Sequence, residues 1–123
     1  SLKENNSGKI YPRNLAYAKK ALEEANFSCE VDNAHKTFIS KAMNKQYMEA
    51  HHLIPLQFQE DFSYSLDIPA NIVSVCPNCH RKLHFGFIED KKEILKKLFE
   101  RKNNKLKEFG IIINEDELFE IYT

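Results

Sequence analysis

The pattern of apolar and polar residues along this chain predicts its first elements. Between residues 12 and 26, apolar residues recur three or four positions apart, which predicts one helix with a single apolar face. Two short apolar runs, partly β-branched, predict strands at residues 47–50 and 71–75. A tight turn follows at residues 76–79, and we expect another helix to start there.

The last third of the chain reads as helix with clear end signals. A long charged helix is predicted after Phe85-Gly86, and Gly110 is expected to end it. Asn114 followed by Glu117 predicts a capping box at the start of a short acidic helix. Residues 1–10 are polar and rich in turn formers, so we expect a flexible lead-in or linker remnant before a single domain at residues 11–123.

The residues able to bind metal are concentrated in one stretch, residues 47–84, which holds four of the five histidines and two of the three cysteines. Cys76 and Cys79 flank a tight turn, and thiolates with this spacing can share one metal ion. On a helix starting at that turn, His80 and His84 lie one turn apart on the same face, so both imidazoles can reach one ion.

The His51-His52 pair, Asn71, and His80 with His84 after Cys-x-x-Cys together resemble the HNH family of metal-dependent nucleases. The motif covers about a third of the chain. The resemblance implies an α+β fold: a ββα-metal core with a structural zinc knuckle, flanked by an N-terminal helix and C-terminal helices. The chain looks similar to the nuclease domains at the C-terminal ends of bacterial restriction enzymes.

The resemblance also implies roles for the motif residues. His51, His80 and His84 are expected to hold one catalytic divalent ion, and His52 is expected to be the general base. The Asn71 side chain is expected to bridge the intervening loop and hold that base in place. The implied reaction is hydrolysis of a DNA phosphodiester to a 5′ phosphate and a 3′ hydroxyl.

The identity of the catalytic ion is constrained by ligand softness. Many family members carry Asp where His51 stands and Asn where His80 stands, an oxygen-rich set suited to Mg²⁺. Three imidazoles instead favour Zn²⁺, Ni²⁺, Co²⁺ or Mn²⁺ over Mg²⁺ in binding.

A structural zinc site is predicted from the cysteines and one further residue. A four-cysteine family member would show a second thiolate three residues after Cys29, and here that position is Asp32. We therefore predict a tetrahedral site of Cys29, His35, Cys76 and Cys79, with Asp32 as the alternative to His35.

Overall charge bears on how the chain would bind DNA. Eighteen basic and eighteen acidic residues give zero net charge, so contact must come from a local patch or a partner domain. Residues 91–107 carry seven lysines and one arginine against two glutamates, a local charge of +6. A solvated helix surface is the alternative explanation. The candidate DNA contacts are Arg81, Lys91, Lys92 and Lys96.

Partners and compartment follow from the same composition. An odd number of cysteines suits metal binding in a reducing cytoplasm better than a disulfide framework. No apolar run approaches the roughly 20 residues that a membrane span requires. The expected substrate is double-stranded DNA. A homodimer would supply two sites for two strands, and a specificity domain or partner is expected outside this chain.

Three rival interpretations deserve a test. Cys76 to His80 also fits the Cys-x-x-Cys-His pattern of c-type haem attachment, but haem would leave Cys29 and the His51-His52 pair unexplained. The zinc deaminase signature needs His-x-Glu, which is absent. The serious rival is a non-catalytic zinc-binding module for nucleic acid or protein.

Overall fold

The computed structural model describes residues 13–123, in which helices surround a small antiparallel sheet. In chain order the elements are α1 (Leu15–Glu24), β1 (Glu49–His52), the 3-10 helices η2 (Leu56–Asp61) and η3 (Pro69–Asn71), β2 (Ile72–Val75), α2 (Pro77–Phe85), α3 (Ile88–Glu108) and α4 (Glu115–Ile121). The predicted α+β class with a ββα core is confirmed. The lead-in predicted at residues 1–10 lies outside the described residues.

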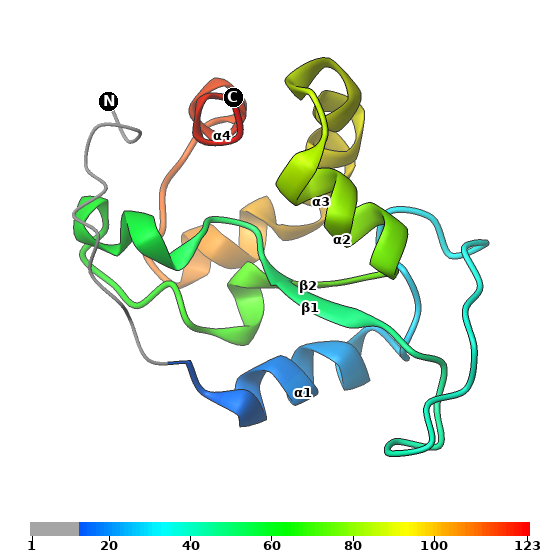
Figure 1. The fold of residues 1–123 in the computed structure, drawn as a ribbon. Coiled ribbons are helices and arrows are strands. Elements are labelled where there is room, and N and C mark those ends of the chain that lie inside the picture. Colours follow the sequence, from blue (N-terminus) through cyan, green and yellow to red (C-terminus); the bar gives the residue numbers. More distant parts are fainter. Residues whose placement is uncertain (1–12) are drawn as a thin grey trace.

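The sheet is a two-stranded layer between helices. Glu49 pairs with Val75 and His52 with Ile72, so β1 and β2 run antiparallel. Figure 1 shows α1 on one face of this pair and α2 on the other, and both helices contact both strands. β2 is buried along its whole length because it is covered from both sides.

β1 begins two residues later than the predicted strand at 47–50. The Tyr47 backbone N–H donates to the Phe38 carbonyl at 2.8 Å, so this part of the chain pairs with the preceding loop rather than with β2. The two rings also stack, with centroids 4.9 Å apart. β1 also extends past residue 50, so both His51 and His52 lie within it, paired with β2.

The turn carrying two cysteines also starts the helix carrying two histidines. Cys76 caps α2, and its Sγ accepts the Cys79 backbone N–H at 3.5 Å. Pro77 stands at the first helical turn, where the missing N–H costs nothing. Gly86 ends the helix. This geometry joins the cysteine pair and the histidine pair into one rigid unit.

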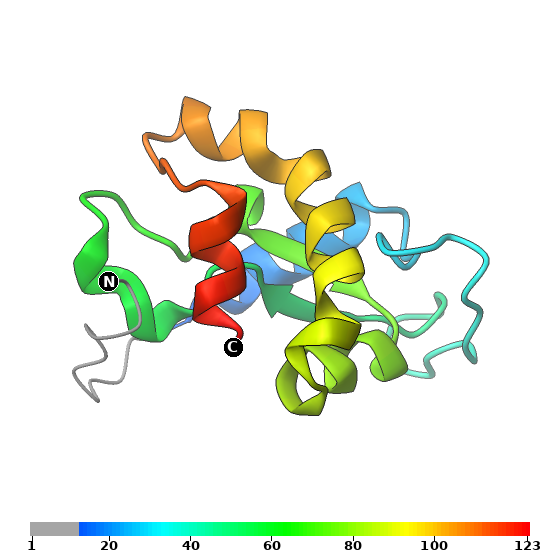
Figure 2. The same cartoon turned by 90° about the horizontal axis from the view of Figure 1, so that it is seen from above.

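After α2 the chain forms two further helices, α3 and α4, which pack against each other. Figure 2 shows α3 and α4 passing over the sheet region, and α3 packs against both α2 and α4. Gly110 ends α3 as predicted, with φ of 79°, and a Cβ there would lie 2.6 Å from the Tyr64 ring. The predicted capping box of Asn114 and Glu117 is present at α4. No helix within residues 13–123 combines the length and apolarity needed to cross a membrane.

The long connection between the strands is packed against the core. Phe58 is 2% exposed and belongs to the main hydrophobic cluster, with Phe62 packed against it. Tyr64 is 60% exposed, but its ring covers Gly110. The aromatic residues of this loop therefore serve mainly to hold it in place.

Candidate active site and metal centres

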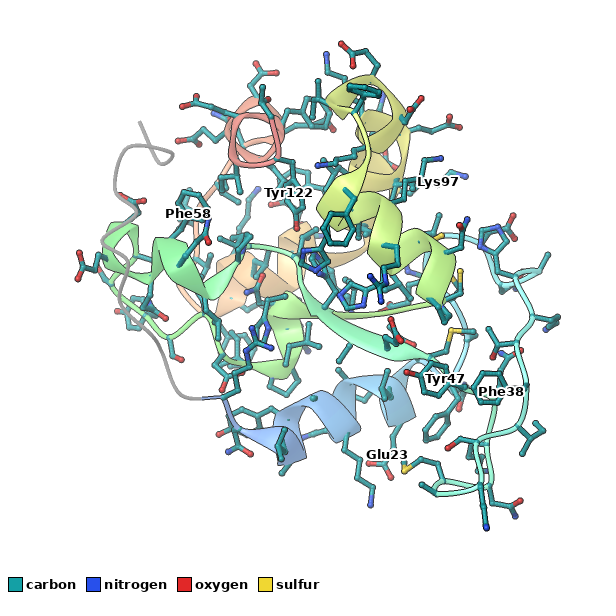
Figure 3. All side chains as sticks on the ribbon, viewed as in Figure 1. Glu23, Phe38, Tyr47, Phe58, Lys97 and Tyr122 are labelled. Atoms are coloured by element: carbon teal, nitrogen blue, oxygen red, sulfur yellow. The ribbon has the colours of Figure 1, made fainter. Side chains whose placement is uncertain are left out.

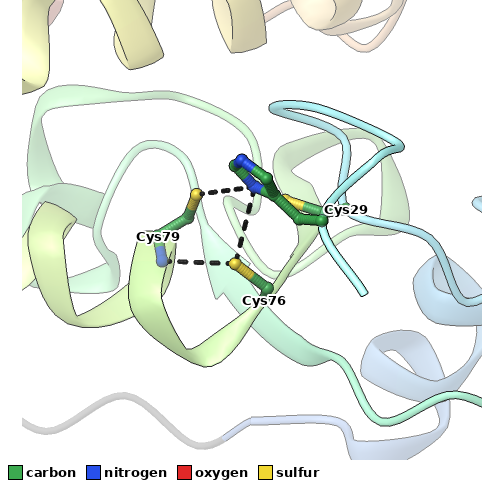
Figure 4. Close-up of side chains that lie close together, drawn as sticks. Cys29, Cys76 and Cys79 are labelled. Atoms are coloured by element: carbon green, nitrogen blue, oxygen red, sulfur yellow. Dashed lines mark hydrogen bonds between the residues drawn. The ribbon is translucent and has the colours of Figure 1, made fainter. Parts of the chain in front are cut away.

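The first candidate metal centre lies where α2 meets the loop after α1. One ligand atom from each of Cys29, His35, Cys76 and Cys79 lies within 4.8 Å of the others. His35 Nδ1 is 3.7 Å from Cys76 Sγ and 3.5 Å from Cys79 Sγ. Figure 4 shows the three cysteine side chains gathered beside the start of α2. All three cysteines are buried and free of disulfides.

The buried thiols of this cluster influence one another's ionisation. Burial raises the pKa of the Cys79 thiol, and negative charge on Cys29 raises it further. Burial opposes ionisation of Cys29 as well, but backbone N–H donors and His35 lower its pKa overall. Three thiolates this close repel one another, and a divalent cation removes that repulsion. The set of three sulfurs and one imidazole fits Zn²⁺.

The geometry brings His35, rather than Asp32, to the three sulfurs. The Asp32 carboxylate lies 3.8 Å from His35 Nε2, the ring nitrogen opposite the one facing the cysteines. A separation of 3.8 Å is longer than a hydrogen bond, so the carboxylate lies near the far side of the ring without a hydrogen bond to it. Asp32 therefore lies on the side of His35 away from the sulfurs, and His35 is the fourth candidate ligand.

The second candidate centre joins β1 to α2. Ligand atoms of His51, His80 and His84 lie within 4.8 Å of one another. The Nε2 atoms of His80 and His84 approach to 3.1 Å. Burial, followed by the neighbouring His80 and His84, lowers the pKa of His51 to about 3. Burial and His80 also lower the pKa of His84. Imidazoles that resist protonation and face one another are suited to share a metal ion.

Glu49 sets the tautomer of His80. Its Oε1 lies 2.8 Å from His80 Nδ1, and its Oε2 accepts the Tyr47 hydroxyl at 2.6 Å. The Tyr47 hydrogen bond, with His80 among the further causes, lowers the pKa of Glu49. A carboxylate accepts only, so His80 Nδ1 carries the proton and Nε2 keeps its lone pair for a metal.

Tyr122 sets the tautomer of His51 in the same way. Its hydroxyl donates to the Leu53 carbonyl at 2.6 Å, which uses its single proton. The Tyr122 oxygen, 2.7 Å from His51 Nε2, must then accept a hydrogen bond from that nitrogen. Figure 3 shows Tyr122, the residue that follows α4, pointing toward the interior. His51 Nδ1 is consequently the nitrogen with a free lone pair.

His52 lies beside this cluster with a different partner. Successive strand residues point to opposite sides, so the His52 ring has a hydrogen-bond partner of its own although it lines the same cleft as His51. Its Nε2 lies 2.9 Å from Asp67 Oδ1, with both side chains 14% exposed. Asp67 Oδ2 accepts the Asn14 backbone N–H at 2.6 Å, which fixes the carboxylate from its other side. The carboxylate holds the proton on His52 Nε2 and leaves Nδ1 as an acceptor.

Asn71 is fully buried and ties the loop between the strands together. Its side-chain oxygen accepts the Ile54 N–H at 2.9 Å. Its amide N–H groups donate to the carbonyls of Ile54 at 3.0 Å and Leu66 at 2.9 Å. Ile54 lies two residues after His52, and Leu66 precedes Asp67. The amide therefore holds together the two segments that carry the His52–Asp67 pair.

One cleft of about 520 Å³ contains all four histidines of the motif. Its cationic lining comes from Arg13 and Lys91. Lys91 is only 7% exposed and donates to the Tyr122 carbonyl at 3.2 Å. These charges make the cleft attractive to an anion such as phosphate.

The remaining basic residues of α3 are distributed differently from a single DNA-binding face. Arg101 and Lys102 lie 3.4 and 3.3 Å from Glu30, and Lys105 lies 3.7 Å from Glu108. The basic residues near the C-terminal end of α3 are therefore paired with carboxylates, whereas Lys91 near its N-terminal end lines the histidine cleft. Two of the four predicted DNA contacts line clefts: Lys91 lines the histidine cleft, and Arg81 lines a neighbouring one. The other two do not: Lys92 lies over the Phe119 ring, and Lys96 is exposed.

Sequence reasoning missed four residues of this site: Arg13, Glu49, Asp67 and Tyr122. Glu49 was detectable, because it lies two positions before His51 on the same strand and so points to the same side. Asp67 and Tyr122 carry no local signal, since only the folded loop and α4 bring them to the histidines.

Comparison with known proteins agrees with this geometry. A family model described as HNH endonuclease matches residues 29–86. The chain is also similar to the type IV methyl-directed restriction enzyme EcoKMcrA of Escherichia coli (strain K12), with 33% identity over 91 residues. That match covers 74% of this chain but 30% of the relative, so the chain spans less than a third of the relative's length in matched sequence.

Proposed function

Residues 29–86 belong to the HNH endonuclease family, and on that premise we propose that this chain is the nuclease domain of a restriction-type enzyme that hydrolyses DNA phosphodiester bonds. One observation carries the proposal. An imidazole held by a carboxylate, His52 with Asp67, lines the same cleft as a cluster of three further imidazoles. A general base and a metal cluster together are what phosphodiester hydrolysis requires.

In this proposal His51, His80 and His84 hold the divalent ion, which when bound neutralises phosphate charge and stabilises the departing 3′ oxygen. Glu49 and Tyr122 keep the rings of His80 and His51 oriented for that task. Cys29, His35, Cys76 and Cys79 hold a structural zinc that fixes the start of α2, and thereby the positions of His80 and His84.

His52 acts as the base. Its Nε2–H stays hydrogen-bonded to Asp67, so Nδ1 is the nitrogen that accepts a proton from water. The oxygen of that water attacks phosphorus at the same time. The bond from phosphorus to the 3′ oxygen breaks, and the departing 3′ alkoxide takes a proton from solvent water, which leaves a 5′ phosphate and a 3′ hydroxyl. Asp67 stabilises the imidazolium that forms. Asn71 keeps the two segments carrying His52 and Asp67 at a constant separation.

DNA is the proposed substrate because the relative is a restriction enzyme and because Arg13 and Lys91 place positive charge in the cleft. Choice of target, including any dependence on methylation, is assigned in this proposal to a region or partner beyond the matched stretch. Cutting both strands needs two sites, so we propose that the active form pairs two nuclease domains.

Supercoiled plasmid, incubated with Zn²⁺, Ni²⁺, Co²⁺, Mn²⁺ or Mg²⁺, tests the proposal. We expect the wild type to produce nicked and linear forms. We expect His52→Ala to slow cutting by about 10²- to 10⁴-fold while retaining its fold and DNA binding. A wild type that binds DNA but cuts with none of these ions would instead favour a non-catalytic zinc module. A His52→Ala variant that cuts at the wild-type rate would remove His52 from the mechanism.

A further inference from the structure

A second cleft, of about 580 Å³, lies next to the histidine cluster. Ala50, His80 and His84 line both this cleft and the one that contains His52. The two clefts therefore meet at the proposed metal ligands. A polymer whose scissile phosphate sits on those ligands has its neighbouring nucleotide within reach of the second cleft.

The outer wall of this cleft carries an aromatic ring without the burial that such rings usually have. Phe85 is 76% exposed, and its ring centroid lies 6.1 Å from that of His84. The Arg81 guanidinium lies 5.9 Å from the same ring. An exposed ring next to a cation is the combination that proteins use to stack nucleobases and hold the adjoining backbone.

The charges of the cleft decide how a nucleotide would lie in it. The Glu49 side chain lines the same cleft and is 28% exposed, against 76% for Phe85, so it forms the inner side; its two carboxylate oxygens are engaged by His80 and Tyr47. A phosphate is repelled there, whereas it is attracted by Arg81. The inner cleft thus suits an uncharged group, such as a base.

We propose that this cleft binds one unstacked nucleotide beside the scissile phosphate, with its base on Phe85 and its phosphate on Arg81. This inference rests on the proposed function. A base within regular duplex is already stacked on its neighbours and cannot lie flat on Phe85. The preferred substrate is accordingly DNA that is single-stranded, or opened, next to the cut.

The test is a cycle between the side chain and the base, with cleavage removed by His52→Ala in the zinc-loaded chain. Affinity is measured by fluorescence anisotropy for an oligothymidine and for an abasic oligonucleotide of the same length. Adding Phe85→Ala should weaken oligothymidine binding by about tenfold and leave abasic binding unchanged. Phe85→Trp should restore oligothymidine binding.

Phe87 supplies the matched control. It is 79% exposed and two residues away, yet it lies outside the lining of this cleft. Phe87→Ala should bind both oligonucleotides like the parent. Equal losses with both oligonucleotides on Phe85→Ala, or no loss with either, overturn the proposal. Plasmid cutting by the wild type, measured on the same preparation, shows separately whether the nuclease assignment fails with it.

Discussion

The hydroxyl of Tyr122 lies 2.7 Å from Nε2 of His51, although the two residues are 71 positions apart in sequence. Because Tyr122 uses its own proton on the Leu53 carbonyl, it receives the His51 proton and leaves Nδ1 free. The residue that caps the last helix of the fold thereby orients a residue of the first strand. A residue outside the HNH match thus supports the proposed metal centre.

Removing that hydroxyl should weaken the three-histidine centre. In Tyr122→Phe the ring keeps its packing, but His51 loses the acceptor for its Nε2–H. We expect affinity for Co²⁺ at this centre to fall by about 10- to 100-fold, the usual effect of losing such a supporting hydrogen bond. Isothermal titration calorimetry on protein that carries zinc only in the cysteine centre measures this affinity. Tyr64→Phe, which alters a ring packed on Gly110, should bind Co²⁺ like the wild type.

Asp67 should act only through His52. Asp67→Ala frees the imidazole to rotate and to change tautomer, so plasmid cutting should slow by at least about tenfold. The double variant His52→Ala with Asp67→Ala should be no slower than His52→Ala alone, because residues that act as a unit are not additive. Metal affinity should be unchanged in all three variants. An additive loss in the double variant would show that Asp67 serves some other purpose.

His35 should matter more than Asp32 for the cysteine centre. His35→Ala removes a proposed ligand, whereas Asp32→Ala removes the carboxylate behind it. We expect zinc to be lost from His35→Ala at a chelator concentration that leaves Asp32→Ala loaded. Zinc content after dialysis against a graded series of chelator concentrations measures the difference. Preferential loss of zinc from Asp32→Ala would reverse the assignment.

The three-histidine centre should prefer borderline-soft ions. Imidazole nitrogens suit Zn²⁺, Ni²⁺ and Co²⁺, and Mg²⁺ prefers oxygen ligands. Calorimetry with the cysteine centre already filled should therefore give tighter binding of Zn²⁺, Ni²⁺, Co²⁺ and Mn²⁺ than of Mg²⁺. His84→Ala should abolish that difference. Equal or tighter Mg²⁺ binding by the wild type would argue against this ligand set.

Asn71 should be costly to replace. Its side chain makes three hydrogen bonds in a fully buried position, and Asn71→Ala leaves the Ile54 N–H and two carbonyls without that partner. We expect a loss of about 2–5 kcal/mol in unfolding free energy, measured by urea denaturation of the zinc-loaded protein. Cutting should be lost along with it if the loop no longer keeps Asp67 on His52.

The sequence alone determined the local features. These features depend on neighbours within a few residues. They are the end of a helix at Gly110, the start of another at Asn114, the turn between Cys76 and Cys79, and the one-turn separation of His80 and His84. Such features follow from capping, turn chemistry and the helical period, so they were predictable. The family resemblance added the order of the histidines around Asn71.

Tertiary structure decided which groups orient the histidines. Asp67 reaches His52 because the loop between the strands folds back around Asn71, and Tyr122 reaches His51 because α4 packs on α3. The shift of β1 by two residues has the same origin, since Tyr47 pairs with Phe38 in a preceding loop. These contacts join residues far apart in the chain, and hydrophobic periodicity describes only near neighbours. The candidate ligands could be proposed from residue types, but the orientation of their side chains required the fold.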